Sequence, residues 1–358
     1  MHIAFLHSSL AFSGATERLL AAARAAADHG ARVSVLAPGG SRSEAFECDG
    51  IQVVPAEVHE SSVRAPFLFW RTRRLLRQLA PDLLHVTDQG LAPFAAELSR
   101  ALNLPWMLEL NRPTRRTLIA PSALLRAVIV PCETSIESAV NRARIPRPLL
   151  SVLRHGPALE LVRASRTFDE VERPCIGSVG YLDEDHGTEV FLEAARRLTR
   201  SGRRLRFLVL GEGPREDHLR RRVRQLELNE SVTIAAPALD DPRNALREFD
   251  IQASCTLEGD PGWLACQALG MGIPSVLSSV HASYQLIDDK RTGLIVERAD
   301  PAKLAGQIDV LLENPRAACQ LGARARVRML ENESASQFAE SLARLHERAL
   351  STAATSPA

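Results

Sequence analysis

The chain has 358 residues, 45% of them hydrophobic, and its 44 lysines and arginines are balanced by 43 aspartates and glutamates to a formal net charge of +1. Because domains usually have about 100–200 residues, this length predicts two domains. A net charge near zero excludes a general electrostatic attraction to nucleic acid, so we expect no nucleic-acid partner.

The cysteines and the N-terminus narrow the class of protein further. Six cysteines lie far apart, at Cys48, Cys132, Cys175, Cys255, Cys266 and Cys319. Without a Cys-x-x-Cys pair they predict neither a zinc site nor a disulfide framework. The segment Met1–His7 lacks the basic and long apolar regions of a signal peptide, and no run of about 18 apolar residues predicts a membrane span. We therefore expect a cytoplasmic protein.

The first part of the chain alternates short apolar runs with helical patterns, which is typical of parallel α/β domains. Strands are predicted at Ile3–Leu6, Val33–Leu36, Ile51–Val54, Leu83–Val86, Trp106–Leu110, Ala127–Val130 and Leu149–Leu153. The first strand is followed by a helix that ends at Gly30. Regular patterning fades between Arg154 and Pro174, which predicts a linker there.

A second unit of the same style follows. Strands are predicted at Cys175–Val179, Arg206–Leu210, Val232–Ala235, Ile251–Ser254 and Pro274–Leu277. Helical stretches at about 300–313, 317–330 and 335–349 end the chain. The expected fold class is α/β, with two Rossmann-like domains facing each other across a cleft. The expected boundaries are 1–160, 161–340, and a helix end with a frayed tail at 341–358.

Two motifs in the first domain follow strands. The stretch Gly14-Ala15-Thr16-Glu17-Arg18 opens a helix, and a glycine there lets the backbone approach a phosphate or sugar near a helix N-terminus that favours anions. Such a glycine is also a common structural feature of α/β turns. The second motif is Asp82-x-x-His85-x-Thr87, in which His85 is expected to be structural.

Three motifs in the second domain are more specific. A glycine-rich segment runs from Gly177 to Gly187, and the turn Gly211-Glu212-Gly213-Pro214 follows the next strand. The longest motif runs from Glu258 to Pro274 and includes Gln267-Ala268-Leu269-Gly270-Met271-Gly272-Ile273-Pro274.

Together these segments resemble the retaining glycosyltransferases with two Rossmann domains (the GT-B type), the glycogen-synthase-like group often called group 1 or family 4. The resemblance runs from Met1 to about Leu330 and is most specific in the second domain. It implies a nucleoside-diphosphate-sugar donor bound by the C-terminal domain and a glycan or lipid-linked acceptor bound by the N-terminal domain. It also implies transfer of a hexosyl-type sugar with retention of configuration, no metal and no cofactor, in polysaccharide or glycolipid biosynthesis.

The sequence departs from the family at the positions that carry its chemistry. The family has histidine where this chain has Thr87, and arginine and lysine where it has Tyr181 and His186. Gln267 stands where the family has the glutamate that holds the ribose. We expect Gly14, Tyr181, His186 and Gln267 to bind the donor. The catalytic carboxylate is expected to be Glu258 or Asp260, if the loop shifts by one residue.

These departures leave a rival hypothesis, a pseudo-glycosyltransferase that binds nucleotide sugars or glycans without turnover. An epimerase of the same double-Rossmann shape is a more distant alternative. The stretch 63–79 mixes aromatic and apolar residues with arginines, which suits an anionic membrane surface. Such a pattern is more often that of a Rossmann helix that packs on its sheet and keeps its arginines in water.

Overall fold

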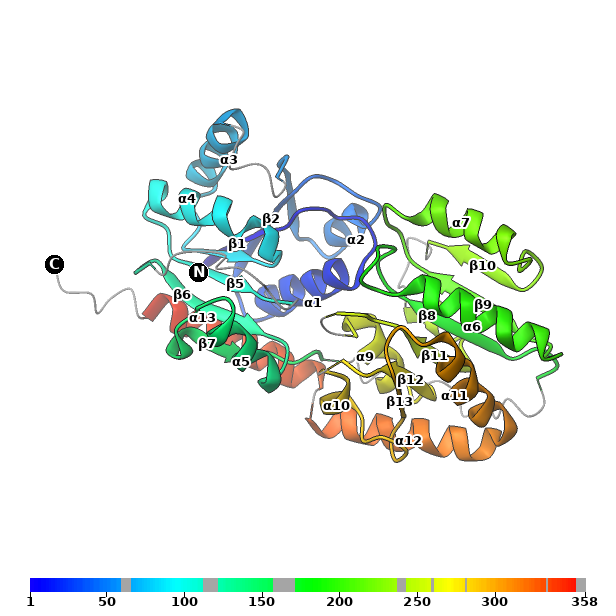
Figure 1. Ribbon diagram of the computed structural model, residues 1–358. Helices are drawn as coiled ribbons and strands as arrows, with labels where there is room; N and C mark the ends of the chain where they lie inside the picture. The colour runs from blue at the N-terminus through cyan, green and yellow to red at the C-terminus, as the bar shows by residue number, and fades with distance from the viewer. Residues whose placement is uncertain are drawn as a thin grey trace. The chain divides into compact units, whose positions relative to one another are not determined.

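The computed structural model describes residues 1–58, 66–111, 122–156, 171–236, 243–258, 261–280, 282–332 and 334–351. These residues form two units, each built on its own parallel sheet (Figure 1). Unit 1 comprises the described residues of Met1–Ala11, Ala15–Arg154 and Ser336–Ala358. Unit 2 comprises those of Phe12–Gly14 and His155–Ala335.

The sheet of unit 1 has seven parallel strands in the order β3-β2-β1-β4-β5-β6-β7. The strands are β1 (His2–Leu6), β2 (Arg32–Ala37), β3 (Gln52–Pro55), β4 (Leu83–Val86), β5 (Trp106–Glu109), β6 (Leu125–Val130) and β7 (Leu150–Val152). The helices are α1 (Gly14–Asp28), α2 (Ser43–Cys48), α3 (Pro66–Leu79), α4 (Ala92–Leu102), α5 (Glu133–Asn141) and α13 (Ala335–Ser351), with short 3-10 helices at Gln89–Leu91 and Arg147–Leu149.

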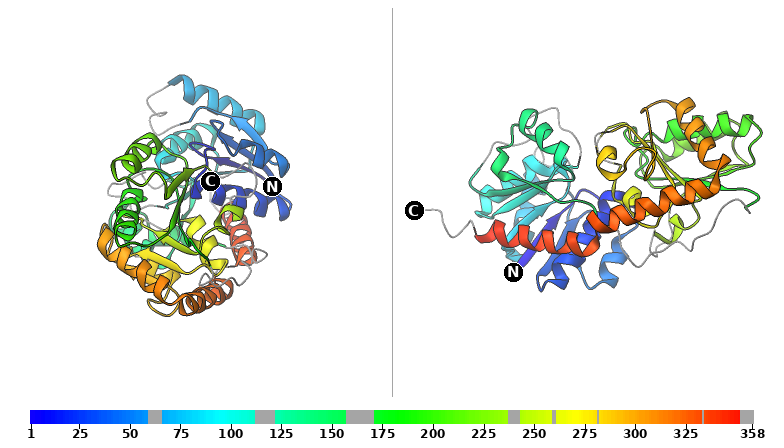
Figure 2. Two further views of the ribbon diagram at one scale, coloured as in Figure 1. Left: turned by 90° about the vertical axis from the view of Figure 1, so that its right-hand side faces the viewer. Right: turned by 90° about the horizontal axis from the view of Figure 1, so that it is seen from below.

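Side chains alternate between the two faces of this sheet, because successive residues of a strand point to opposite sides. Ala4 and Leu6 of β1 and Leu84 of β4 pack in one core cluster with α3, α4 and α5. Phe5 and His85, at the alternate positions, face α1 and α13 on the other side. The last helix of the chain therefore covers one face of the first sheet, as Figure 2 shows for the red helix.

The sheet of unit 2 has six parallel strands in the order β10-β9-β8-β11-β12-β13. The strands are β8 (Cys175–Val179), β9 (Arg206–Leu210), β10 (Val232–Ala235), β11 (Ile251–Ser254), β12 (Ser275–Ser278) and β13 (Leu294–Val296). The helices are α6 (Thr188–Arg200), α7 (Glu216–Gln225), α8 (Arg243–Leu246), α9 (Trp263–Gly270), α10 (Ser283–Leu286), α11 (Pro301–Glu313) and α12 (Pro315–Asn332).

Each sheet reverses its strand order once, between β1 and β4 in unit 1 and between β8 and β11 in unit 2. In open α/β sheets, ligands bind outside the carboxyl ends of the strands at such a reversal, where the connections diverge to opposite faces and leave a crevice. The segments that follow β1, β4, β8 and β11 are therefore the expected positions of a ligand-binding site.

The helix ends follow from local sequence. α1 is closed by Gly30, which has a φ of +80°. The Gly30 N–H donates to the Ala27 carbonyl at 2.8 Å and the Ala31 N–H to the Ala26 carbonyl at 3.0 Å. This pair of bonds is the Schellman ending that glycine favours, since it has no Cβ to oppose a positive φ.

The predicted strands are confirmed, with bounds that differ by at most two residues. The expected domain boundary at 160/161 falls in 157–170, outside the described residues. The helix expected over 63–79 is present from Pro66, and its residues 63–65 also lie outside the described residues. Of the helices described, none is long and apolar enough to cross a membrane.

Candidate functional site

The loop that follows β8, residues Gly180–Gly187, is fixed on two sides. The Leu182 N–H donates to the Glu212 carbonyl at 2.9 Å, and the Arg215 N–H donates to the Leu182 carbonyl at 3.0 Å. On the other side, the Leu257 N–H donates to the Asp185 carbonyl at 2.7 Å. These hydrogen bonds join the loop to the segments that follow β9 and β11. The loop is therefore held in place at the carboxyl edge of the sheet, beside the strand reversal.

Gly187 allows this close approach. It is the N-cap residue of α6 and has a φ of +64°, and a Cβ added there would lie 2.1 Å from the carbonyl oxygen of Cys255. No side chain fits at that distance, and an L-residue is disfavoured at that φ. Glycine is therefore required both by the backbone angle and by the contact with the segment after β11.

His186 is held by the carboxylate of Asp183. Its Nδ1 lies 2.7 Å from Asp183 Oδ1, and its backbone N–H donates to the same oxygen at 3.0 Å. The Tyr181 ring stands edge-on to the imidazole, with centroids 6.4 Å apart. The structure thus brings together Tyr181 and His186, two of the residues expected to bind the donor, on one braced loop.

A small hollow lies beside His186. Its lining includes four short hydroxyl side chains: Ser178 on β8, Thr188 at the start of α6, Ser254 at the end of β11 and Thr256 just after it. Burial raises the pKa of Cys255, which also lines it, to about 12. The thiol therefore stays neutral and is no nucleophile, so the polar groups that the hollow offers are the hydroxyls and the imidazole of His186.

Arg215 is a cation at this loop that motif comparison missed. Its guanidinium lies 3.3 Å from Glu184 and 3.0 Å from Glu189, and its side chain is 25% exposed. The only sequence signal was its position, directly after the Gly-x-Gly-Pro turn. Since two carboxylates share its charge, Arg215 is a weaker partner for a diphosphate than an unpaired arginine would be.

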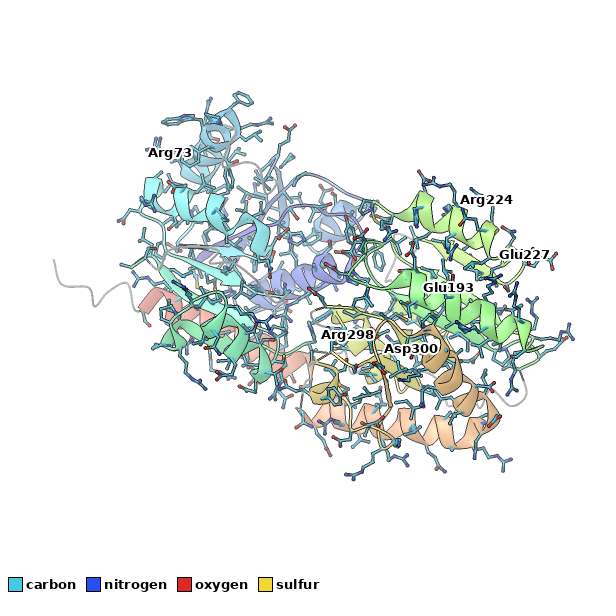
Figure 3. All side chains as sticks on the ribbon, viewed as in Figure 1. Arg73, Glu193, Arg224, Glu227, Arg298 and Asp300 are labelled. Atoms are coloured by element: carbon cyan, nitrogen blue, oxygen red, sulfur yellow. The ribbon has the colours of Figure 1, made fainter. Side chains whose placement is uncertain are left out.

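Gln267 lies on α9 and is buried. Its amide nitrogen donates to the carbonyl oxygen of Gly156 at 3.3 Å. Glu258 is exposed on the loop after β11, one residue beyond Leu257, whose carbonyl accepts a hydrogen bond from Arg298 (labelled in Figure 3). Asp260, the other candidate carboxylate, lies outside the described residues.

A second polar group gathers at the strand reversal of unit 1. His7 follows β1, and its Nδ1 lies 2.9 Å from the hydroxyl of Thr87, which follows β4. Ser8 donates to the carboxylate of Asp88, and Asn111 donates to the Thr87 carbonyl at 3.4 Å. Burial lowers the pKa of His7, against the opposing effect of Asp88 and Glu109, so the ring is neutral.

The sequence motifs identified Thr87 in this group but not His7. The only sequence feature that could have indicated His7 is its position directly after the first strand. Uncharged donors and acceptors with one carboxylate suit sugar hydroxyls better than a phosphate. The group is therefore a candidate for contacts with a sugar or polyol.

Two charged residues of the Gly14–Arg18 motif form ion pairs inside the protein. Gly14 is the first residue of α1. Glu17 is buried and pairs with Arg42 at 2.6 Å, whereas Arg18 is buried and pairs with Glu109 at 2.9 Å. The carboxylate of Glu17 and the guanidinium of Arg18 are thus both neutralised by buried partners.

Glu109 shows the strength of the second ion pair. Burial would raise the pKa of its carboxyl, but Arg18 and His85 more than reverse this effect and hold it well below the usual range. His85 is fully buried and lies 3.3 Å from Glu109, which fits the expectation that it is structural. Across the described part of the chain, no three His, Cys, Asp or Glu side chains are grouped so as to hold a metal ion.

Known proteins match both units. Residues 13–156 match the family described as "Glycosyl transferase 4-like domain", and residues 173–314 match "Glycosyl transferases group 1". The two matches take in most of the chain, one for each Rossmann-like unit. The chain therefore belongs to the group 1, family-4-like glycosyltransferases, and the expected resemblance to this group is confirmed.

Individual relatives are more distant. The alpha-D-kanosaminyltransferase of Streptomyces kanamyceticus is 29% identical over 164 residues, which cover 45% of this chain and 40% of that protein. An uncharacterized glycosyltransferase of Haemophilus influenzae is 22% identical over 340 residues, or 91% and 94% of the two chains. The chain thus covers about two fifths of the first relative and nearly all of the second.

A solved structure shows the same fold. Alr3699/HepE of Anabaena, crystallised in complex with UDP-glucose, superposes with a TM-score of 0.79 at 16% identity, covering 97% of this chain and 99% of that one. The expected GT-B class of two Rossmann-like domains is confirmed.

Proposed function

We propose that this protein transfers a glycosyl group from a nucleoside-diphosphate sugar to a glycan or lipid-linked acceptor. The observation that carries the proposal is the braced Gly180–Gly187 loop at the strand reversal of unit 2, inside the segment that matches the group 1 family. The UDP-glucose bound by Anabaena HepE supports a sugar nucleotide as the donor, and the kanosaminyltransferase supports sugar transfer as the reaction.

In this proposal unit 2 binds the donor, with Tyr181 and His186 facing the diphosphate and Gln267 serving the ribose. Glu258 or Asp260 contacts the transferred sugar, and Gly14 gives the donor a close backbone approach. Unit 1 binds the acceptor, through the polar group around His7 and Thr87. Donors aimed at the leaving diphosphate stabilise the charge that develops there, which is the main source of rate in such reactions. Retention of configuration, a hexosyl-type sugar and a role in polysaccharide or glycolipid synthesis follow from the family resemblance.

The rival, a binding protein without turnover, rests on the substitutions at Thr87, Tyr181, His186 and Gln267. Those substitutions reduce the charge available to bind the donor sugar nucleotide. They do not remove the hydrogen-bonding groups, since the side chains of tyrosine, histidine and glutamine can all still donate a hydrogen bond. The match of both units to transferase families favours the enzyme.

His186→Lys tests the role of the loop. A lysine amine carries a full positive charge at neutral pH, so the substitution places a cation on the loop that is proposed to face the diphosphate. We expect His186→Lys to raise nucleoside-diphosphate affinity by about fivefold or more at pH 7.5, since hydrogen bonds between charged groups are the stronger ones, and His186→Ala to lower it. Titration calorimetry with UDP, GDP and ADP measures this directly. His29→Lys, at an exposed histidine just after α1, is the matched control and should bind as the wild type does. Unchanged affinity in both His186 variants would remove His186 from the diphosphate site.

α3 adds a peripheral membrane contact to the proposal. Its buried side, which includes Thr72 and Leu76, packs on the core of unit 1. Its other side exposes Phe67 (73%) and Trp70 (60%). Arg71, Arg74 and Arg77 continue that exposed face at helical spacing, and α3 contains no acidic residue. Arg73, labelled in Figure 3, lies 4.9 Å from the Trp70 ring centroid. Exposed aromatics beside arginines are suited to an anionic lipid surface, where a lipid-linked acceptor would be found.

The double variant Phe67→Ser, Trp70→Ser should bind vesicles containing phosphatidylglycerol at least about tenfold more weakly than the wild type, because two large apolar side chains no longer enter the interface. Co-sedimentation measures this binding, and phosphatidylcholine vesicles give the uncharged comparison. Val327→Ser, at an exposed apolar position on α12, is the control and should bind as the wild type does. Equal sedimentation of the double variant and the wild type would contradict the membrane contact.

A further inference from the structure

The C-terminal helix is attached to unit 1 through a histidine. The buried face of α13 consists of Phe338, Leu342, Leu345, His346 and Ala349. His346 is completely buried, and its Nε2 lies 3.1 Å from Nδ1 of His85 on β4. A histidine in the middle of an apolar helix face is costly to bury unless its ring nitrogens are paired. The partners of the two ring nitrogens of His346 therefore influence how firmly α13 packs on unit 1.

The contact continues into a buried group of His85, Glu109 and Arg18, which come from three elements. His85 Nε2 lies 3.3 Å from Glu109 on β5, and Glu109 pairs at 2.9 Å with Arg18 on α1. Arg18 also donates to the Leu153 carbonyl at 3.1 Å, and its guanidinium lies 5.2 Å from the ring centroid of Phe338 on α13. The Phe5 ring flanks both histidines, at 4.8 Å from His85 and 6.2 Å from His346. α13 therefore touches this group at two points, His346 and Phe338.

The contact between the two rings leaves a doubly protonated His346 unsatisfied. The rings share one hydrogen bond, between Nε2 of His346 and Nδ1 of His85, and either nitrogen can be its donor. The other nitrogen of His346, Nδ1, is buried and has no hydrogen-bond partner among the described residues. A doubly protonated His346 would therefore carry a buried Nδ1–H without an acceptor, while the carboxylate of Glu109 is already paired with Arg18.

We propose that α13 is an acid-sensitive latch, which stays docked on unit 1 while His346 is neutral and is released when that ring is protonated. The groups that face His346 are His85 on β4, Glu109 on β5 and, beyond it, Arg18 on α1. Release would free the end of the chain and uncover the apolar face of α13.

The direction of the pH effect follows from the burial of the ring. Burial and the neighbouring His85 lower the pKa of His346 well below its ordinary value, and Glu109 opposes them only in part. A histidine whose pKa is lower in the docked than in the released state favours docking fully above about pH 6.5. Below that pH, docking weakens by up to about tenfold for each pH unit, until the pKa of the docked state is reached.

Hydrogen–deuterium exchange of the full-length protein tests the latch between about pH 7.5 and pH 5, with rates corrected for intrinsic exchange. In the wild type, peptides of α13 should lose protection below about pH 6.5, while peptides of α12 in unit 2 keep theirs. His346→Gln retains a nitrogen donor at the Nε2 position but cannot titrate, so its α13 protection should not depend on pH. His29→Gln, at an exposed histidine just after α1, is the matched control and should behave as the wild type.

Three results would overturn the proposal. One is α13 protection in the wild type that does not change with pH. Another is an equal loss of protection in His346→Gln. The third is parallel loss in α12 and α13, which would indicate general acid unfolding. This last comparison needs only the wild type, so the proposal remains testable if His346→Gln does not fold.

Discussion

Arg18→Met is expected to destabilise unit 1 by about 3–5 kcal/mol. The substitution keeps most of the side-chain volume but leaves the carboxylate of Glu109 buried without its cation. Glu109 is 1% exposed, so water cannot replace the lost partner. Removing one member of a buried pair is costly for this reason, whereas removing both is often nearly neutral. Arg18→Met with Glu109→Leu should therefore recover much of the lost stability.

Urea unfolding followed by the fluorescence of Trp106, in a background with Trp70 and Trp263 replaced by phenylalanine, reports on unit 1. The matched control is Arg100→Met, which removes the exposed partner of Glu97 and should cost no more than about 1 kcal/mol. A loss for Arg18→Met as small as that of the control would contradict the assignment of Arg18 as the structural partner of the buried Glu109.

Gly187→Ala is expected to destabilise unit 2 by about 2–5 kcal/mol, the sum of an unfavourable positive φ and forced displacement of neighbouring atoms. The new methyl group would lie 2.1 Å from the Cys255 carbonyl oxygen, so the Gly180–Gly187 loop must move away from the segment after β11. That movement displaces His186 and Tyr181. We therefore also expect nucleoside-diphosphate affinity to fall at least about tenfold, which is about 1.4 kcal/mol of binding free energy.

Gly202→Ala separates these two causes. Gly202 also has a positive φ, +88°, but no atom lies within 4 Å of the added methyl group. It should cost only about 1–2 kcal/mol and leave nucleotide affinity unchanged. Scanning calorimetry and titration calorimetry on both variants give the comparison. Equal affinity for Gly187→Ala and the wild type would contradict a donor site at this loop.

The strands and the helix ends could be predicted because both depend on local sequence. Buried parallel strands appear as short apolar runs such as Leu83–Val86, and a helix ends where glycine allows a positive φ, as at Gly30. The position of α13 on unit 1 is a long-range property. The feature that fixes it, the contact between His85 and His346, joins residues 261 positions apart, and neither residue alone has a pattern that indicates it.

The candidate site could be predicted only in part, for a similar reason. Motif positions identified Tyr181 and His186, which the structure brings together on one loop. They could not reveal that Glu17 and Arg18 are committed to buried ion pairs, because the partners Arg42 and Glu109 come from distant segments. His7 was missed because a lone histidine after a strand is informative only when its neighbour across the sheet, Thr87, is known.

The most direct test of the central claim is a transfer assay with the full-length protein and a panel of UDP-, GDP-, dTDP- and ADP-sugars. Release of the nucleoside diphosphate would be followed over time, and the anomeric configuration of the product would be read by NMR. Our account predicts multiple turnovers with at least one donor, in an acceptor-dependent reaction whose product retains the configuration of the donor sugar. Tight binding of a donor without any turnover, across the panel and with glycan and lipid-linked acceptors, would contradict it and favour a binding protein.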